Sequence, residues 1–332
     1  MNIIILKESD IKEIFSMKDA IKASKDALEL YSKGESDIPL RVNIDVPEEN
    51  GQSLYMPGYV SGARALGVKI VSTYPDNSKI GLETISSMMV MKDSATGEIN
   101  AIMDGNYLTK LRTGAVSGAA TDLLARKDAK IFALIGTGGQ ARTQLEAILN
   151  VRAIQEVRVS GRDKEKGQKF ADAMMEEFGQ AFNVSIKFVE NSDEAIDGAD
   201  IITTATTSPR PVFDGRLVKK GAHINGVGSF TPTMQEIDPY TLNHAEKIYL
   251  DTRDGVLNEC GDFIIPIESG EFSKDKITGE LGEAIAGKIK SRENDEEITL
   301  FNTVGSAVLD LVTAKRIYDK AVKEEKGSRI DL

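Results

Sequence analysis

Residues 129–141 have the sequence AKIFALIGTGGQA, in which a short and almost fully apolar run leads into a glycine-rich turn. Such a run is typical of a strand that is buried on both faces of a parallel sheet. The turn has the spacing G-x-G-x-x-A from Gly136 to Ala141, and the helical pattern QARTQLEAILN follows it directly. Strand, glycine-rich turn and helix in this order predict a Rossmann-type dinucleotide-binding domain.

Each position in this turn has a physical reason. Gly136 permits the tight turn, Gly138 lets the backbone approach a pyrophosphate, and Ala141 allows the helix to pack closely on the strand. The phosphates would lie at the helix N-terminus, where unpaired N–H groups and the helix dipole favour negative charge. A plain structural turn is the alternative. The strand before the turn and the helix after it favour dinucleotide binding.

Downstream of the turn, strand-like and helix-like segments alternate as far as residue 251. This alternation predicts βαβ units and a parallel sheet. The segments are EVRVSG, KEKGQKFADAMMEEF, SIKFVE, DEAIDGA, DIITTAT, AHINGV and KIYLD.

Upstream, the chain predicts a mixed α+β unit. A helical face begins at Met17 and ends before Gly34, and two-residue alternation marks strands at 41–46 and 67–71. In these strands we expect Arg41 and Lys69 on the faces turned away from the core. A β-hairpin around residues 94–97 and a helix over 107–124 complete the unit.

A last helix over about 306–324 has no evident place in the parallel sheet, so we expect it to return to the N-terminal unit. The predicted fold is α/β, with a Rossmann-type parallel-sheet domain inserted in a discontinuous α+β domain. The expected boundaries are 1–121 with 306–332 for the first domain and 122–305 for the Rossmann domain.

Composition excludes several classes of protein. The 332 residues include 41 Lys+Arg and 52 Asp+Glu, so the net charge is 41 − 52 = −11, which disfavours nucleic acid or an anionic membrane as a partner. The one cysteine, Cys260, allows no internal disulfide, and with only His223 and His244 a Cys/His zinc site cannot form. We expect no metal. The chain has no signal-peptide pattern and no long apolar stretch, so we expect a cytoplasmic, soluble protein.

The tip of the second Rossmann strand indicates which nucleotide binds. NAD-specific sites carry an Asp or Glu there for the ribose hydroxyl, but this chain has Val159-Ser160-Gly161-Arg162. Ser160 and Arg162 could accept a 2′-phosphate, because a guanidinium matches phosphate oxygens. Asp163 lies next to them. The sequence therefore favours NADP(H), with NAD(H) as the alternative.

Three cations within the acidic chain are candidates for binding a substrate. Arg41, Lys69 and Arg112 would together hold a carboxylate if the fold brings them together, since arginine makes bidentate contacts with carboxylates. Their spacing alone does not show that they meet, and each taken singly could be a solvated surface residue.

Seven segments, in order along the chain, resemble the ornithine cyclodeaminase/μ-crystallin family. They are PLRVNID, GVKIV, DGNYLTKLRTGAVSGAA, IGTGGQA, INGVGSFTPTMQEID, ECGDFIIPI and FNTVGSAVLDL. The resemblance implies a substrate-binding and dimerisation domain made from both ends of the chain, an inserted Rossmann domain, and a homodimer.

The resemblance also implies roles for individual residues. Arg41, Lys69 and Arg112 match the family's substrate-carboxylate cluster, with Lys69 and Arg112 as the catalytic pair and Lys69 as a proton donor or imine-orienting group. The expected cofactor contacts are Thr84, Arg112, Gly136, Gly138, Gly139, Gln140, Ala141, Ser160, Arg162, Thr204, Val227 and Ser229.

Two departures from the family pattern indicate the reaction. Cyclodeaminases and the related alanine dehydrogenases carry an Asp where this chain has Phe230, and phenylalanine cannot accept a proton. Leu54 stands near where ornithine-specific members carry a Glu. Asp104, Glu83 or Glu236 could supply the missing acid, and the sequence does not choose among them.

The sequence therefore predicts an NAD(P)H-dependent reductase of a small cyclic imino acid. Δ1-pyrroline-2-carboxylate and Δ1-piperideine-2-carboxylate are the expected substrates, and an L-amino acid such as proline is the product. The first alternative is ornithine cyclodeaminase, which forms proline and ammonia and retains NAD+. An alanine dehydrogenase and a non-catalytic binding protein are further alternatives. His223 and His244 are expected to be structural.

Overall fold

The computed structural model describes residues 2–331, which fall into two compact units. Unit 1 comprises the chain up to Arg112 together with the residues from Ser306 onward, and unit 2 runs from Thr113 to Gly305. The predicted α/β class, with one parallel sheet inserted in a discontinuous α+β unit, is confirmed. The functional domain boundaries at 121/122 and 305/306 stay a prediction.

Unit 1 is an eight-stranded mixed sheet with helices from both ends of the chain. Its sheet has the order β16-β1-β7-β6-β5-β4-β2, with β3 paired to β4. The elements are β1 (Asn2–Leu6), α1 (Glu8–Ile14), α2 (Met17–Ser32), β2 (Ser36–Asp37), β3 (Val42–Val46), η1 (Pro47–Glu49), β4 (Gly51–Val60), η2 (Ser61–Ala63), β5 (Ala65–Thr73), η3 (Pro75–Ile80), β6 (Ile85–Lys92), β7 (Ile99–Asp104), α11 (Ala307–Lys323) and β16 (Ser328–Asp331).

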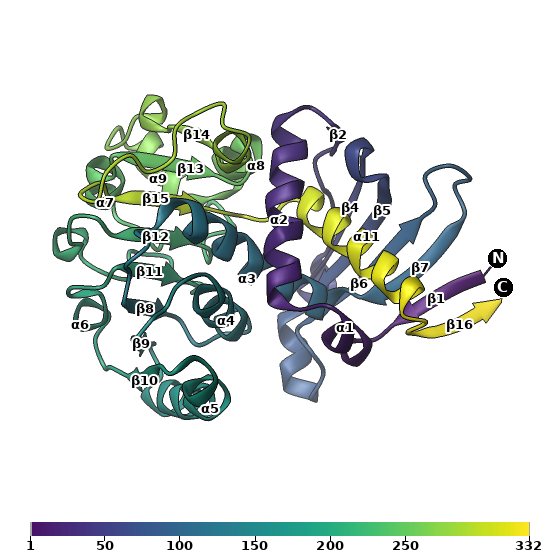
Figure 1. The fold of residues 1–332 in the computed structure, drawn as a ribbon, viewed down its shortest axis with the longest axis horizontal. Coiled ribbons are helices and arrows are strands. Elements are labelled where there is room, and N and C mark those ends of the chain that lie inside the picture. Colours follow the sequence, from purple (N-terminus) through teal and green to yellow (C-terminus); the bar gives the residue numbers. More distant parts are fainter. Residues whose placement is uncertain (1, 332) are drawn as a thin grey trace. The chain divides into compact units, whose positions relative to one another are not determined.

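The predicted hairpin and the return of the last helix are both present in unit 1. Strands β6 and β7 pair in antiparallel register around the turn at 93–98. Helix α11 packs against α2 and against strands β4, β5 and β6 (Figure 1). Strands β1 and β16 pair with each other, so the two ends of the chain lie side by side (Figure 1).

Helix α11 decides which face of the strands is buried, and one expectation is wrong for this reason. Lys69 lies on the same side of β5 as Ala65 and Gly67, and this side faces α11, so Lys69 is buried rather than turned away from the core. A Cβ on Gly67 would lie 3.3 Å from Leu311 Cδ2, which shows how closely the helix approaches. In β3, by contrast, the apolar Val42 and Ile44 are 54% and 50% exposed.

Unit 2 is an eight-stranded sheet in which every strand pair is parallel. Helix α3 (Gly105–Leu124) leads into it. The further elements are β8 (Ile131–Ile135), α4 (Ala141–Val151), β9 (Glu156–Ser160), α5 (Lys164–Phe182), β10 (Ser185–Phe188), α6 (Ser192–Ile196), β11 (Ile201–Thr204), η4 (Gly215–Leu217), β12 (His223–Gly226), α7 (Pro239–His244), β13 (Lys247–Leu250), α8 (Arg253–Glu259), α9 (Gly261–Glu268), η5 (Lys274–Lys276), β14 (Gly279–Glu280), α10 (Leu281–Ile285) and β15 (Thr299–Asn302).

The strand order in unit 2 is that of a doubly wound fold. The sheet runs β10-β9-β8-β11-β12-β15-β13-β14, so the winding direction reverses between β8 and β11 (Figure 1). In such sheets ligands bind at the carboxyl ends of the strands, at this reversal point. Strand β15 was not among the predicted strands. It is only four residues long, and it is placed by partners far away in sequence, β12 and β13.

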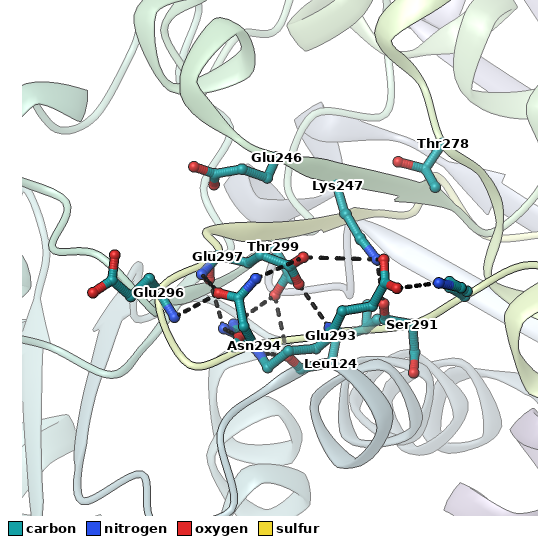
Figure 2. Close-up of polar contacts among 12 residues, drawn as sticks. Leu124, Glu246, Lys247, Thr278, Ser291, Glu293, Asn294, Glu296, Glu297 and Thr299 are labelled. Atoms are coloured by element: carbon teal, nitrogen blue, oxygen red, sulfur yellow. Dashed lines mark hydrogen bonds and ion pairs between the residues drawn. The ribbon is translucent and has the colours of Figure 1, made fainter.

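A polar cluster at residues 291–297 ties a loop to the sheet of unit 2 (Figure 2). Lys247, the first residue of β13, donates from Nζ to the Ser291 carbonyl at 2.6 Å and pairs with Glu293 at 2.6 Å. The Glu297 carboxylate accepts from the Glu293 backbone N–H at 2.8 Å. A cavity of about 460 Å³ beside this loop is lined by Ala284 and residues 287–293 and shares no residue with the predicted site. The hydrogen bonds and ion pair of the cluster hold the loop against β13.

None of the helices within residues 2–331 has both the length and the apolar character that crossing a bilayer requires.

Candidate active site

A buried carboxylate on α11 holds two cations in unit 1. Lys69 Nζ donates to Asp310 Oδ2 at 2.6 Å, and Arg112 Nε donates to Asp310 Oδ1 at 3.0 Å. The side chains of Lys69 and Asp310 are 2% and 0% exposed. Strand β5, helix α3 and helix α11 each supply one of the three groups, so the cluster exists only when both ends of the chain have folded together.

The cluster has more positive than negative charge and has unused donors. Two cations share one anion, so its net charge is 2 − 1 = +1. Within residues 2–331, the terminal nitrogens of Arg112 form no hydrogen bond. Lys69 Nζ donates only one hydrogen bond there, although an ammonium has three N–H groups. A buried net charge with unused donors is costly unless an anion joins it. The site is therefore suited to bind a carboxylate.

The surroundings of Lys69 lower the pKa of its ammonium to about 8. Burial is the largest cause, and the charges of Arg112 and Arg41 act in the same direction, while Asp310 opposes them. Burial alone would raise the pKa of Asp310, but the charges of Arg112 and Lys69 and their hydrogen bonds hold it below its ordinary value. At neutral pH the cluster thus consists of a carboxylate and two cations.

In addition to burial, the charges of Arg112 and Arg41 both act on Lys69 and lower its pKa. Arg41 precedes β3 and is half-buried. Leu54 pairs with Val71 across β4 and β5, two residues along each strand from the pair of Met56 with Lys69, so Leu54 shares the face of Lys69. An apolar side chain thus stands where ornithine-specific relatives are expected to carry an acid. Thr84, just before β6, is also half-buried, and its carbonyl accepts from Tyr74 N at 2.8 Å.

The glycine-rich turn of unit 2 leaves room for a phosphate. Gly136 has φ 111°, and a Cβ there would lie 2.4 Å from the Ala205 carbonyl oxygen, so only glycine fits. A Cβ on Gly138 or Gly139 would meet no atom within 4 Å. The Oε1 atom of Gln140 is buried and has no partner within residues 2–331. Open backbone before the N-terminus of α4 fits the pyrophosphate of a dinucleotide.

The tip of β9 carries no carboxylate that could hold a ribose. Ser160 is buried, and its carbonyl accepts from Gly136 N at 2.8 Å. Arg162 is exposed and forms no hydrogen bond or ion pair within the described chain. Asp163 caps α5, where its Oδ1 accepts from Lys166 N at 3.1 Å. The acid next to Arg162 is thus committed to the helix.

The other predicted cofactor residues also lie at the carboxyl edge of this sheet. Ala141 opens α4, and Thr204 ends β11. Val227 and Ser229 follow β12, and both are buried. Ser229 Oγ donates to the Met234 carbonyl at 2.7 Å, which folds the segment after β12 back on itself.

Of the three acids that could replace the one missing at Phe230, the two in unit 1, Asp104 and Glu83, form no ion pair with the Lys69 cluster within the described chain. Asp104 accepts from Tyr107 N at 2.7 Å at the start of α3, and Glu83 is exposed. Glu236 lies buried in unit 2. Sequence reasoning missed Asp310, although an acid among the apolar residues of AVLDLV was a detectable signal, because a charge on a buried helix face requires a partner.

The histidines and the cysteine have structural surroundings. Burial, and next the charge of Arg292, lowers the pKa of His223 to about 3, and its ring contacts Thr299 and Asn225. His244 stacks on Tyr240. Burial raises the pKa of the Cys260 thiol, which disfavours the thiolate that a nucleophile requires. Among residues 2–331, no three His, Cys, Asp or Glu side chains are grouped so as to bind a metal ion.

Comparisons with known proteins match nearly the whole chain. The model of the ornithine cyclodeaminase/mu-crystallin family matches residues 1–325. A Δ(1)-pyrroline-2-carboxylate reductase of Bacillus cereus is 40% identical over 329 residues, which cover 99% of this chain and 100% of the relative.

Solved structures show the same fold. The Δ(1)-pyrroline-2-carboxylate reductase of Thermococcus litoralis, in complex with NADH and L-proline, matches with a TM-score of 0.92 and 41% identity over 99% of this chain and 100% of that chain. An archaeal alanine dehydrogenase dimer with bound NAD matches with a TM-score of 0.91 and 33% identity over all of both chains. These relatives are NAD(H)-dependent oxidoreductases.

The substitution Asp310→Asn tests the buried cluster. It leaves two buried cations without a counter-ion, so we expect the free energy of unfolding to fall by about 3 kcal/mol or more. Chemical denaturation followed by circular dichroism measures this change. Asp319→Asn on the same helix is the control, because it breaks only the exposed pair with Lys315 and should cost less than about 1 kcal/mol. Equal effects of the two substitutions would contradict the buried ion cluster.

Proposed function

The chain belongs to the ornithine cyclodeaminase/mu-crystallin family, and on that premise we propose that it is a reductase of a small cyclic imino acid. The substrate is Δ1-pyrroline-2-carboxylate or its six-membered homologue Δ1-piperideine-2-carboxylate, and the product is the L-amino acid. The observation that carries this proposal is the buried Lys69–Asp310–Arg112 cluster, which has a net charge of 2 − 1 = +1 and unused donors. The reductases of Bacillus cereus and Thermococcus litoralis support it.

Arg112 binds the substrate carboxylate in this proposal. Its Nε is committed to Asp310, which fixes the plane of the guanidinium. The two terminal nitrogens remain for a bidentate contact with the carboxylate, whose charge neutralises the excess positive charge of the cluster. Arg41 adds a further positive charge nearby and is the second carboxylate-binding group.

Lys69 holds the proton that the imine nitrogen needs. Reduction of C=N adds one hydride to carbon and one proton to nitrogen. An ammonium whose pKa is lowered to about 8 is still protonated at neutral pH and gives up its proton more readily than an ordinary lysine. Asp310 stays ionised beside it and stabilises the ammonium between turnovers.

A nicotinamide dinucleotide bound at the carboxyl edge of unit 2 supplies the hydride. Gly136, Gly138, Gly139, Gln140 and Ala141 would hold its pyrophosphate, and Thr84, Arg112, Thr204, Val227 and Ser229 its nicotinamide half.

Phe230 sets the choice between imine reduction and deamination. It is 47% exposed, and its ring can neither accept a proton nor pair with a substrate ammonium. A reductase that receives a ready-made imine has no need of a base for an amine at this position. Cyclodeamination of ornithine and oxidation of alanine both start from an amine and do need one.

NADP(H) preference is the finer part of the cofactor proposal. Arg162 is exposed without a partner in the described chain, and Asp163 is occupied as a helix cap, so the β9 tip favours a 2′-phosphate over a free ribose hydroxyl. The bound cofactors of the two structural neighbours are NADH and NAD, which makes NAD(H) the alternative.

A homodimer in the cytoplasm completes the proposal. Unit 1 exposes large apolar side chains around β3, η3 and β6, which monomeric proteins rarely do in such number. They are Leu40, Val42, Ile44, Ile80, Leu82, Ile85 and Met88. A mass in solution of twice the 36.1 kDa of one chain is the expected result of light scattering. The single, buried Cys260 suits a reducing compartment, which cell fractionation tests.

The function is tested by following the absorbance of NADPH or NADH at about 340 nm with freshly made Δ1-pyrroline-2-carboxylate or Δ1-piperideine-2-carboxylate. We expect rapid loss of the reduced cofactor and formation of the L-amino acid. L-ornithine with NAD+ and L-alanine with NAD+ are run beside it. Ammonia and proline from ornithine, with no imine reduction, would instead identify a cyclodeaminase, and NADH formation from alanine would identify an alanine dehydrogenase.

The pH dependence of kcat/KM tests Lys69. Its ammonium is present below a pKa of about 8, so the rate of reduction should fall as the pH rises through that value. Lys69→Met should lose activity by about 100-fold or more at every pH. Lys69→Arg keeps its charge to much higher pH but does not release its proton, so this variant should also lose most of its activity, and the residual rate should show no alkaline fall near pH 8. A fall at the same pH in Lys69→Arg would assign the titration to another group.

Cofactor preference is tested with Arg162→Gln. Loss of a charge-assisted contact with a 2′-phosphate should lower kcat/KM for NADPH by about tenfold or more while changing the value for NADH little. The ratio of the two values in the unaltered enzyme is the reference. A variant with an unchanged ratio would show that Arg162 does not bind a phosphate.

A further inference from the structure

Glu236 in unit 2 is a fully buried acid that the proposed chemistry does not use. Its carboxylate accepts three hydrogen bonds from the segments that end strands β11 and β12. Thr204 Oγ1 donates to Oε2 at 2.9 Å, Gly228 N donates to Oε2 at 2.6 Å, and Thr206 N donates to Oε1 at 2.6 Å. One side chain thus joins the carboxyl ends of two neighbouring parallel strands.

No cation shares this charge. Within residues 2–331, no lysine or arginine forms an ion pair with Glu236, so its partners are backbone amides and threonine hydroxyls. Both oxygens are occupied and shielded from solvent. Burial raises the pKa of Glu236. This full set of local hydrogen bonds favours a structural role for Glu236 over that of the acid missing at Phe230.

Hydrogen bonds to Asp262 hold the backbone of the segment that carries Glu236. Asp262 Oδ1 accepts from Glu236 N at 2.5 Å and from Ile237 N at 3.0 Å, and Asn302 Nδ2 donates to Asp262 Oδ2 at 3.2 Å. Asn302 ends β15, the strand next to β12. Hydrogen bonds thus connect Glu236 and its segment to the carboxyl ends of three adjacent strands, β11, β12 and β15.

The strand ends have no room to shift independently. A Cβ on Gly228 would lie 2.1 Å from the Thr206 carbonyl oxygen and 2.7 Å from Glu236 Cδ. The two backbone segments are in direct contact with each other and with the carboxylate. A substitution that alters the Glu236 carboxylate must therefore shift the backbone at Thr204, Val227 and Ser229, or leave the amide of Thr206 or Gly228 without an acceptor.

The location of this contact matters because of the strand order. The reversal of winding lies between β8 and β11, with the glycine-rich turn and β9 on one side and β11 and β12 on the other. A dinucleotide that lies across this edge with its pyrophosphate at the turn has its adenosine half toward β9 and its nicotinamide half over β11 and β12.

We propose that Glu236 is a positioning residue that fixes the Thr204–Thr206 and Val227–Ser229 segments as the platform for the nicotinamide half of the cofactor. It acts through backbone amides and touches neither cofactor nor substrate. The inference rests on the proposed function, since it presupposes that a nicotinamide dinucleotide binds at this edge.

The test compares Glu236→Gln with the unaltered protein for two probes, NADH and ADP-ribose, which lacks the nicotinamide. The carboxamide places an NH₂ against an amide donor in either orientation, so the platform must shift. We expect the Kd for NADH, measured by its fluorescence, to rise at least about tenfold, and the Kd for ADP-ribose, measured by calorimetry, to change less than about twofold. Without any ligand, the amides of Thr206 and Gly228 should exchange hydrogen faster.

Asp200→Asn is the matched control at the opposite edge of the same sheet. Asp200 accepts from Lys130 N at 2.7 Å and Ile131 N at 2.9 Å, so it joins the starts of β8 and β11 as Glu236 joins the ends of β11 and β12. This control should lower the melting temperature yet leave both dissociation constants unchanged. If Glu236→Gln does not fold, Glu236→Asp, which retains the charge on a shorter stem, should show the same selective loss of NADH affinity.

Three outcomes would overturn the proposal. They are an unchanged Kd for NADH in a folded Glu236 variant, an equal weakening of NADH and ADP-ribose, and the same loss of NADH affinity in Asp200→Asn. If the unaltered protein binds neither NADH nor ADP-ribose, the proposed function is wrong. If it binds both but one of the three outcomes above occurs, only the role of Glu236 is wrong.

Discussion

The shared hydrogen bonds of Asp310 with Lys69 and Arg112 are the interaction on which unit 1 depends. Three ionised groups in the core would each cost several kcal/mol if left alone. The Asp310 carboxylate offsets part of that desolvation cost, because its oxygens lie 2.6 Å from Lys69 Nζ and 3.0 Å from Arg112 Nε. The remaining positive charge is the basis of the proposed function, because a substrate carboxylate supplies the missing anion. The stability of the unit and the proposed binding of a carboxylate thus have one physical source.

Two buried carboxylates in this chain show opposite behaviour for a physical reason. Asp310 faces two cations, which hold its pKa below the ordinary value although burial opposes them. Glu236 accepts hydrogen bonds from amides and threonine hydroxyls, and burial raises its pKa. The first stays ionised and keeps Lys69 protonated, while the second holds the backbone in place. Their surroundings, rather than the residue type, thus underlie the different roles proposed for the two carboxylates.

At the carboxyl edge of the sheet in unit 2, backbone segments pack directly against each other. Gly136 lies against the Ala205 carbonyl and Gly228 against the Thr206 carbonyl, at distances that a side chain would not permit. Carboxylates act at both edges of the sheet, Asp200 at the strand starts and Glu236 at the strand ends. The carboxyl edge is consequently closely packed at Gly136 and Gly228 and open at Gly138, where a phosphate would need space.

The sequence by itself determined the class of fold, the glycine-rich turn, the inserted parallel sheet and the family, because these depend on local patterns and on motifs within short segments. It also indicated which cations to consider. It did not place Lys69 on the correct face, since the burial of that face is decided by α11, which lies more than two hundred residues further along the chain. Asp310 and the role of Glu236 were missed for the same reason. A charge buried against partners distant in sequence is assigned only when tertiary structure brings them to hydrogen-bonding distance.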